Sequence, residues 1–286
     1  MIPSIPQSKA FKASYVVYVT LFFIFLLAPL LVVGIFAFND SMFPSPPWAG
    51  FTWDWFLSDA EPQLGLFFDK QLYSSIWTSF IVAIFTTLLA VSLATNNAFL
   101  FERNNFRGKN ILYILTLLPV VIPGVILGVS ILIMSSTAAN YFDDVWGIDI
   151  EILRPGLPLV IIGQFAFITT ICTLIISARL RSFDLTLEEA ALNLGATKLQ
   201  AVFTITMPFL MPALIGAAVI SFLMSFENFN TTLMLVGSDS PLTITLYDRL
   251  REGATPVINA VSLLLMIGSI MLALANYFLQ GKDKDK

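Results

Sequence analysis

Six long runs of apolar residues alternate with shorter polar segments along the chain. They lie near residues 15–38, 72–100, 111–135, 157–178, 209–236 and 258–279. Each run is long enough to cross a bilayer as a helix, which takes about 20 residues. Lipid offers no partner to backbone N–H and C=O groups, and the alternation typical of strands is absent. The pattern therefore predicts an all-α polytopic membrane protein with six transmembrane helices. No low-complexity linker divides the chain, so we expect one domain over residues 1–286.

The third apolar run carries residues that disturb a regular helix. Pro119 and Pro123 each lack a backbone N–H, and Gly124 and Gly128 lie four residues apart on one face. A proline inside a helix kinks it, and small residues at this spacing let a neighbouring helix approach closely. We expect one kinked helix over residues 111–135 that packs closely against a neighbour.

The composition agrees with a membrane-embedded bundle. Apolar residues make up 57% of the chain and charged residues 12%, against roughly 25% charged residues in an average soluble domain. The sequence contains no His and a single Cys, Cys172, which excludes histidine general-base chemistry, histidine metal ligands and an intrachain disulfide. We expect neither a catalytic site nor a metal site, and we interpret Cys172 as a small buried hydrophobe. A membrane enzyme would need clustered acid–base or metal-ligating side chains, which the apolar runs lack.

Basic residues are unevenly distributed over the polar segments, and this predicts the orientation of the chain. Three alternate segments are poor in Lys and Arg; they cover residues 39–71, 136–156 and 237–257. Of the 15 basic residues they hold only Lys70, Arg154, Arg249 and Arg251. Cytoplasmic loops are the ones enriched in Lys and Arg, so we expect both termini and segment 179–208 in the cytoplasm. The outer segments are rich in acidic residues, which either reflects topology alone or concentrates cations at the outer mouth.

The polar segment between the fourth and fifth runs contains two signals for short helices. Thr186 is followed three residues later by Glu189, and Thr197 by Gln200, which is the spacing of a capping box at a helix N-terminus. Gly195 lies between the two boxes, where a glycine can take the left-handed conformation that ends a helix. The segment is therefore predicted to form two short helices joined at a bend, before the fifth span.

This pair of helices is too short to cross the membrane. It either lies on the lipid headgroups or binds another protein. An amphipathic helix that lies on lipid headgroups usually carries Lys and Arg on its polar face. The first helix carries Glu188 and Glu189 instead. A docking element for another protein is therefore the better interpretation.

The same segment resembles the EAA motif of ABC importer permeases. In that motif Glu-Ala-Ala is followed at fixed spacing by Gly and then by Ile-x-Leu-Pro. The matching residues are Glu189, Ala190, Ala191, Gly195, Ile205 and Pro208. Met207 replaces the usual Leu, a change that conserves volume. The resemblance implies a type I importer permease in which this loop, with Glu188, is the coupling helix that seats in a groove of the ATP-binding subunit.

Four further stretches resemble the spermidine/putrescine-type permeases, the second of their two membrane subunits. They are FND (38–40), GFTWDWF (50–56), SFENFNTTL (225–233) and TPVINA (255–260). This resemblance implies a multi-pass subunit of the bacterial inner membrane that works with a homologous sister permease, two ATP-binding subunits and a periplasmic solute-binding protein. The chain has no phosphate-binding glycine loop, so ATP and Mg²⁺ are expected only on the ATPase partner. A permease for iron or a phosphonate is the alternative, and no nucleic-acid partner is expected.

One acidic residue, Glu227, falls inside an apolar run. An ionised carboxylate at that depth is costly unless it faces water, a partner or a ligand. We expect it to line this subunit's half of the translocation path and to attract an ammonium group, with an aromatic ring nearby; a hydrogen-bonded Glu that only joins helices is the alternative. The residues assigned to the path are Glu227, Asn228, Phe226, Phe229, Asn230 and Asp40. A secondary transporter would need several such groups and internal repeats, and the sequence offers neither.

Overall fold

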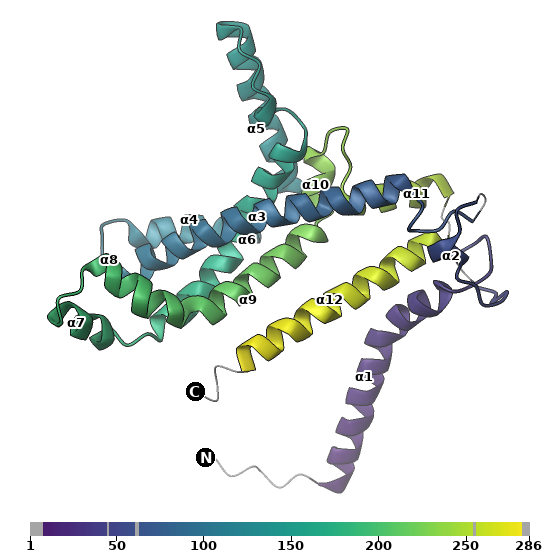
Figure 1. Cartoon of the computed structure of the whole chain (residues 1–286), viewed down its shortest axis with the longest axis horizontal. Coiled ribbons are helices and arrows are strands. Elements are labelled where there is room, and N and C mark those ends of the chain that lie inside the picture. The colour runs from purple at the N-terminus through teal and green to yellow at the C-terminus, as the bar shows by residue number, and fades with distance from the viewer. Residues whose placement is uncertain (1–7, 45, 61–62, 254–255, 282–286) are drawn as a thin grey trace. The chain divides into compact units, whose positions relative to one another are not determined.

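The computed structural model describes residues 8–44, 46–60, 63–253 and 256–281, and helices make up most of this part of the chain (Figure 1). Within it there is no strand beyond one isolated bridge between Asn39 and Phe51. In chain order the elements are α1 (Lys9–Phe36), α2 (Asp54–Leu57), α3 (Lys70–Arg103), α4 (Lys109–Val121), α5 (Gly124–Trp146), η1 (Glu151–Leu153), α6 (Leu157–Arg181), α7 (Thr186–Asn193), α8 (Lys198–Ala201), η2 (Val202–Thr206), α9 (Met207–Phe226), α10 (Asn230–Leu235), α11 (Leu242–Gly253) and α12 (Val257–Gly281).

Six helical stretches among the described residues are long and apolar enough to cross a membrane, as the sequence predicts. They are Lys9–Phe36, Lys70–Arg103, Gly124–Trp146, Leu157–Arg181, Lys198–Phe226 and Val257–Ala275. Four of them follow the expected runs to within a few residues, and the third and the fifth differ. Contacts divide the chain into two compact units, Met1–Lys70 with Arg249–Ile267 and Gln71–Asp248 with Gly268–Lys286. The organisation as one permease domain stays a prediction.

The third span is not the single kinked helix expected over residues 111–135. α4 ends at Val121, Ile122 takes an extended conformation, and α5 begins after Pro123 and continues to Trp146. A residue that precedes proline is pushed out of the helical region, because the proline ring clashes with its backbone. The pair Ile122–Pro123 therefore breaks the helix, whereas Pro119 is accommodated inside α4.

The fifth span differs from the prediction at both ends. The second short helix, α8, is not separate from the fifth span; it continues through the π-helical turn η2 into α9, so that residues Lys198–Phe226 form one continuous helical rod. Pro208 has no N–H to donate to the carbonyl four residues earlier, and the wider turn accommodates its ring. At the other end α9 stops at Phe226 and residues 227–229 are not helical. Glu227 therefore follows the spanning helix and does not lie inside it.

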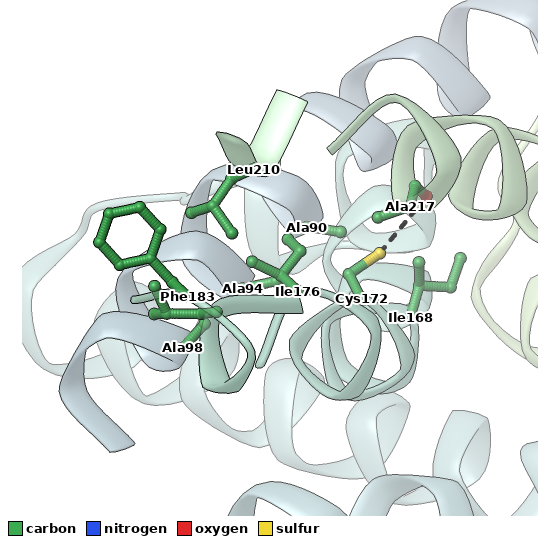
Figure 2. Close-up of a cluster of buried hydrophobic side chains, with 10 residues drawn as sticks. Ala90, Ala94, Ala98, Ile168, Cys172, Ile176, Phe183, Leu210 and Ala217 are labelled. Carbon is green, nitrogen blue, oxygen red and sulfur yellow. Dashed lines mark hydrogen bonds between the residues drawn. The ribbon is translucent and has the colours of Figure 1, made fainter. Parts of the chain in front are cut away.

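Small residues bring the helices of the second unit together. Ala90, Ala94 and Ala98 are fully buried and lie four residues apart on one face of α3, where they pack with residues of α6 and α9 (Figure 2). Small side chains allow such close approach inside a membrane bundle. Cys172 is also fully buried, and its Sγ donates to the carbonyl of Ala217 over 3.6 Å. It thus packs as the small hydrophobe that the sequence indicates.

In the first unit, buried polar groups organise the segment that follows α1. Asn39 is fully buried: its Nδ2 donates to the carbonyl of Pro47, its Oδ1 accepts from the N–H of Ala49, and its backbone carbonyl accepts from Trp55 Nε1. These bonds hold the described residues of this proline-rich segment, 37–44 and 46–57, together.

Candidate functional site

The loop between α6 and α9 begins with a polar turn that differs from the expected capping box. Asp184 Oδ1 accepts from the backbone N–H of Thr186 over 3.0 Å and from its hydroxyl over 2.9 Å. These two bonds lower the pKa of the Asp184 carboxyl, the backbone bond contributing most. The N-cap of α7 is Leu185, with no side-chain cap, so the predicted box of Thr186 and Glu189 is wrong.

The bend and the second cap are as the sequence predicts. Gly195 has a φ of +91°, in the left-handed region that favours glycine, and a Cβ built on it would meet nothing within 4 Å. Thr197 Oγ1 accepts from the backbone N–H of Gln200, and Gln200 Oε1 accepts from the backbone N–H of Thr197 over 2.8 Å. Both signals depend only on residues adjacent in sequence, and the second box is confirmed.

Glu188 and Glu189 have different surroundings although they are neighbours. The carboxylate of Glu188 forms an ion pair with Arg103 at the end of α3, with 3.0 Å between Nη2 and Oε1, and it also accepts from the hydroxyl of Thr206. Glu189 is exposed. Glu188 therefore fixes α7 to the membrane helices, whereas Glu189 is open to a partner.

Three arginines strengthen the same end of the bundle. The guanidinium of Arg103 lies 5.2 Å from the ring centre of Phe183, and that of Arg179 lies 3.9 Å from the ring centre of Phe209. Arg181 forms a bidentate pair with Glu102, with distances of 3.1 and 2.7 Å. These contacts join the ends of α3 and α6 to the loop and the start of α9, which makes the loop a firmly attached element.

The loop presents an exposed apolar surface at the end of α9 remote from α10 (Figure 1). We call it the loop surface; its large members are Leu187, Leu194, Leu199 and Phe203, with exposed fractions of 50, 90, 70 and 65%. Of the residues of the EAA motif, Ala190, Gly195 and Pro208 are exposed, and Ile205 packs against the core of the second unit. Exposed apolar side chains gathered on short, fixed helices are typical of a protein interface.

A second site lies at the gap between α9 and α10. Glu227 is exposed at the C-terminal end of α9, and among the described residues its carboxylate has no hydrogen bond or ion pair. The carbonyls at this end of a helix carry partial negative charge. Phe226 stacks on Phe222 with 5.8 Å between ring centres, and the ring centre of Phe229 lies 5.0 Å from that of Tyr247. A carboxylate, a helix C-terminus and aromatic rings together form an environment suited to a cation.

The other residues assigned to the path have different positions. Asn230 is exposed at the start of α10. The side chain of Asn228 is engaged inside the protein, where its Oδ1 accepts from the backbone N–H and the hydroxyl of Thr232. Asp40 lies in the first unit, where it is exposed and accepts from Gln63 Nε2 over 3.1 Å. Residues 226–230 thus lie together at the gap and Asp40 lies in the other unit, and the role of all of them in the path stays a prediction.

One residue at this gap was not identified as a site residue from the sequence. Gln164 of α6 is buried, and its side-chain amide contacts Ser225 of α9 and Thr232 of α10. A polar amide in the apolar run 157–178 is a signal that could have identified it. Among the described residues no cluster of three or more His, Cys, Asp or Glu side chains could hold a metal ion.

Comparison with known proteins places these features in context. Residues 98–282 match the family of the binding-protein-dependent transport system inner membrane component. The chain is 31% identical over 253 residues to the putrescine transport system permease protein PotI of Escherichia coli (strain K12), covering 88% of this chain and 85% of that protein. It is 24% identical over 270 residues to the spermidine/putrescine transport system permease protein PotC of the same strain, covering 94% of each.

Solved structures with low sequence identity share the fold. A chain of a bacterial ABC transporter involved in the import of the acidic polysaccharide alginate has a TM-score of 0.69 and 18% identity, with 96% of this chain and 98% of that chain covered. A chain of the MetNI methionine ABC transporter has a TM-score of 0.55 and 16% identity, with 74% and 95% covered. Because these importers carry different solutes, the fold alone does not identify the solute.

Proposed function

The chain belongs to the family of the binding-protein-dependent transport system inner membrane component, and from this premise we propose that it forms half of the translocation path for a small cationic solute, a polyamine of the putrescine or spermidine type. It is a permease subunit of an ABC importer and a multi-pass protein of the bacterial inner membrane. Its relatives PotI and PotC are permeases of putrescine and spermidine/putrescine transport systems, which supports this choice of solute.

The observation that carries the proposal is the exposed carboxylate of Glu227 at the C-terminal end of α9. An ammonium group gains from the carboxylate, from the partial negative charge of the helix end and from the ring faces nearby. A polyamine carries several ammonium groups on an apolar chain, so it suits a site in which an acidic group lies close in sequence to the aromatic pairs Phe222–Phe226 and Phe229–Tyr247.

The two alternative solutes fit this arrangement less well. A phosphonate is an anion, and both the carboxylate and the helix C-terminus would repel it. Ferric iron is a hard cation that prefers several oxygen ligands, whereas the described residues contain no group of three or more His, Cys, Asp or Glu side chains that could hold a metal ion.

The loop between α6 and α9 is proposed to couple transport to ATP hydrolysis. Its exposed apolar residues, with the free carboxylate of Glu189, are suited to a groove on an ATP-binding subunit. Two copies of that subunit would bind ATP and Mg²⁺, one below this chain and one below a homologous sister permease, and a periplasmic protein would deliver the solute. This arrangement requires the loop and both termini to be cytoplasmic.

The proposal is tested with Glu227→Gln, which keeps the shape and hydrogen bonding of the side chain and removes its charge. The complete importer, with its ATPase, sister permease and binding protein, is reconstituted into vesicles and assayed for uptake of radiolabelled putrescine and spermidine. We expect the concentration that gives half-maximal uptake to rise about tenfold or more, since about 1.4 kcal/mol of lost attraction corresponds to a factor of ten.

The matched control is Glu151→Gln, which removes one exposed carboxylate from η1 and leaves the gap intact. It separates an effect of the site from a general loss of negative charge outside the membrane, and we expect near-normal uptake. If Glu227→Gln transports both polyamines as the unmodified protein does, the assignment of a cationic solute to this gap is wrong.

A further inference from the structure

A buried amide joins the two helices that end at the gap. Gln164 of α6 is 1% exposed; its Nε2 donates to Thr232 Oγ1 of α10 over 2.9 Å, and its Oε1 accepts from the hydroxyl of Ser225 in the last turn of α9. Ser225 and Thr232 are themselves almost fully buried. Gln164 thus binds both sides of the interruption at residues 227–229, and we call this set of three residues the clamp.

The hydrogen bonds continue from the clamp into the gap. The hydroxyl of Thr232 donates to Asn228 Oδ1 over 3.1 Å, and the backbone carbonyl of Asn228 accepts from the hydroxyl of Thr243 over 3.0 Å. Two members of this network therefore lie on either side of Glu227: Ser225 is two residues before it, and Asn228 follows it directly. The backbone N–H of Glu227 donates to the carbonyl of Leu223 in α9, and the hydrogen bonds of Ser225 and Asn228 hold the residues on either side of it.

Three glycines of α5 and α6 allow these helices to pack closely against α10. A Cβ added to Gly163 would overlap Leu235, one added to Gly128 would lie 3.0 Å from Met234 Cβ, and one added to Gly124 would lie 3.2 Å from Asn230 Cβ. α10 therefore packs closely against α5 and α6, and at these glycines a larger residue would require a neighbouring side chain to shift. With α10 held in this way, the clamp is the contact that sets where the end of α9 stands relative to it.

α9 is also the helix through which the loop reaches the gap. Residues Lys198–Phe226 are helical without interruption from the second capping box to the residue before Glu227. The loop is therefore joined to Ser225 by helix alone.

We propose that Gln164 is a positioning residue, which holds the end of α9 at a fixed place beside α10 and thereby places the Glu227 carboxylate for the solute. This inference rests on the proposed function, because it takes Glu227 as the group that attracts the cation. Without the clamp, the two helices remain folded but their ends vary in separation. Affinity for the solute then falls, while the rate at saturating solute is kept.

The test replaces the whole clamp by apolar residues of similar shape, Gln164→Met with Ser225→Ala and Thr232→Val, so that no buried polar group is left without a partner. Ser225→Ala alone, which removes one of the two arms, is the milder variant if the triple variant does not assemble. The control is Thr173→Val in the same helix, because among the described residues the buried hydroxyl of Thr173 bonds only to the carbonyl of Thr169, within α6.

Two measurements are made on the intact importer. Spin labels at Ile220→Cys and Ser238→Cys, exposed positions on either side of the gap, report the distance between α9 and the end of α10. The native Cys172 is fully buried and does not compete for the label. Uptake of putrescine gives the half-saturating concentration and the maximal rate.

We expect the clamp variant to broaden the distance distribution and to raise the half-saturating concentration roughly tenfold, since small misplacements of a positioned group are costly. Thr173→Val should change neither quantity. An unchanged distance distribution, or an unchanged half-saturating concentration in a variant whose distances have changed, overturns the positioning role. Glu227→Gln measured in parallel distinguishes this failure from that of the proposed function, since loss of the clamp leaves the Glu227 charge in place.

Discussion

The guanidinium of Arg103 and the carboxylate of Glu188 form an ion pair between residues 85 positions apart in sequence, with 3.0 Å between Nη2 and Oε1. The two side chains are only 18 and 20% exposed, so the pair is partly shielded from water. It joins the last residue of α3 to the first turn of α7. The loop therefore moves together with the membrane helices.

Reversal of this ion pair gives the first prediction. Arg103→Glu and Glu188→Arg each place two like charges side by side, and we expect solute-stimulated ATP hydrolysis by the complete importer to fall about five- to tenfold, or about 1–1.4 kcal/mol. The double variant restores opposite charges and should recover most of the activity. A double-mutant cycle on the stimulated ATPase rate measures the coupling. Additive losses in the double variant would show that the pair does not hold the loop.

The second prediction concerns the bend at Gly195. A β-branched residue at a φ of +91° is strained by about 1–2 kcal/mol or more, so Gly195→Val should abolish uptake and stimulated ATP hydrolysis while the subunit still inserts. Gly195→Asn is the matched control, since Asn tolerates the left-handed region and there is free space around the added Cβ. We expect Asn to retain most of the uptake. Equal loss in both variants would mean that side-chain size, and not backbone conformation, matters here.

The third prediction concerns the contact between α6 and α10. In Gly163→Ala the added methyl overlaps Leu235 and lies 3.2 Å from Thr231 Cγ2, so we expect a loss of about 1–3 kcal/mol, the usual cost of overpacking. The control is Gly268→Ala in α12, where an added Cβ meets nothing within 4 Å. Thermal unfolding of the purified importer in detergent should show a lower midpoint for Gly163→Ala alone. The prediction is wrong if both variants unfold at the same temperature.

The fourth prediction concerns the orientation in the membrane. Ala60→Cys lies in an exposed part of segment 39–71, and Lys198→Cys lies in the exposed loop before α9. A membrane-impermeant maleimide added to intact spheroplasts should label the first and reach the second only after permeabilisation. Cys172 is fully buried and gives little background. Labelling of Lys198→Cys in intact spheroplasts would reverse the proposed topology.

The sequence alone determined the features that depend on neighbouring residues. The apolar runs specify helices in lipid, because a helix is the local way to satisfy every backbone group there. The capping box of Thr197 and Gln200 and the left-handed Gly195 are likewise formed within a few residues. The spacing of the EAA motif, which is also a local pattern, was sufficient to indicate the family.

The tertiary structure decided where the polar residues act. The sequence analysis placed Glu227 inside a span, because apolar residues resume after the polar stretch 227–232 and did not indicate that α9 stops at Phe226. At this interruption the hydroxyl of Thr243 donates to the carbonyl of Asn228, and Gln164, on another helix, accepts from Ser225 and donates to Thr232 on the two sides of the gap. The Glu188 side chain is bound to the membrane helices because it forms an ion pair with Arg103, which lies 85 residues earlier in the sequence. Partners so far apart in sequence meet only after the helices have packed, so no local pattern can specify them.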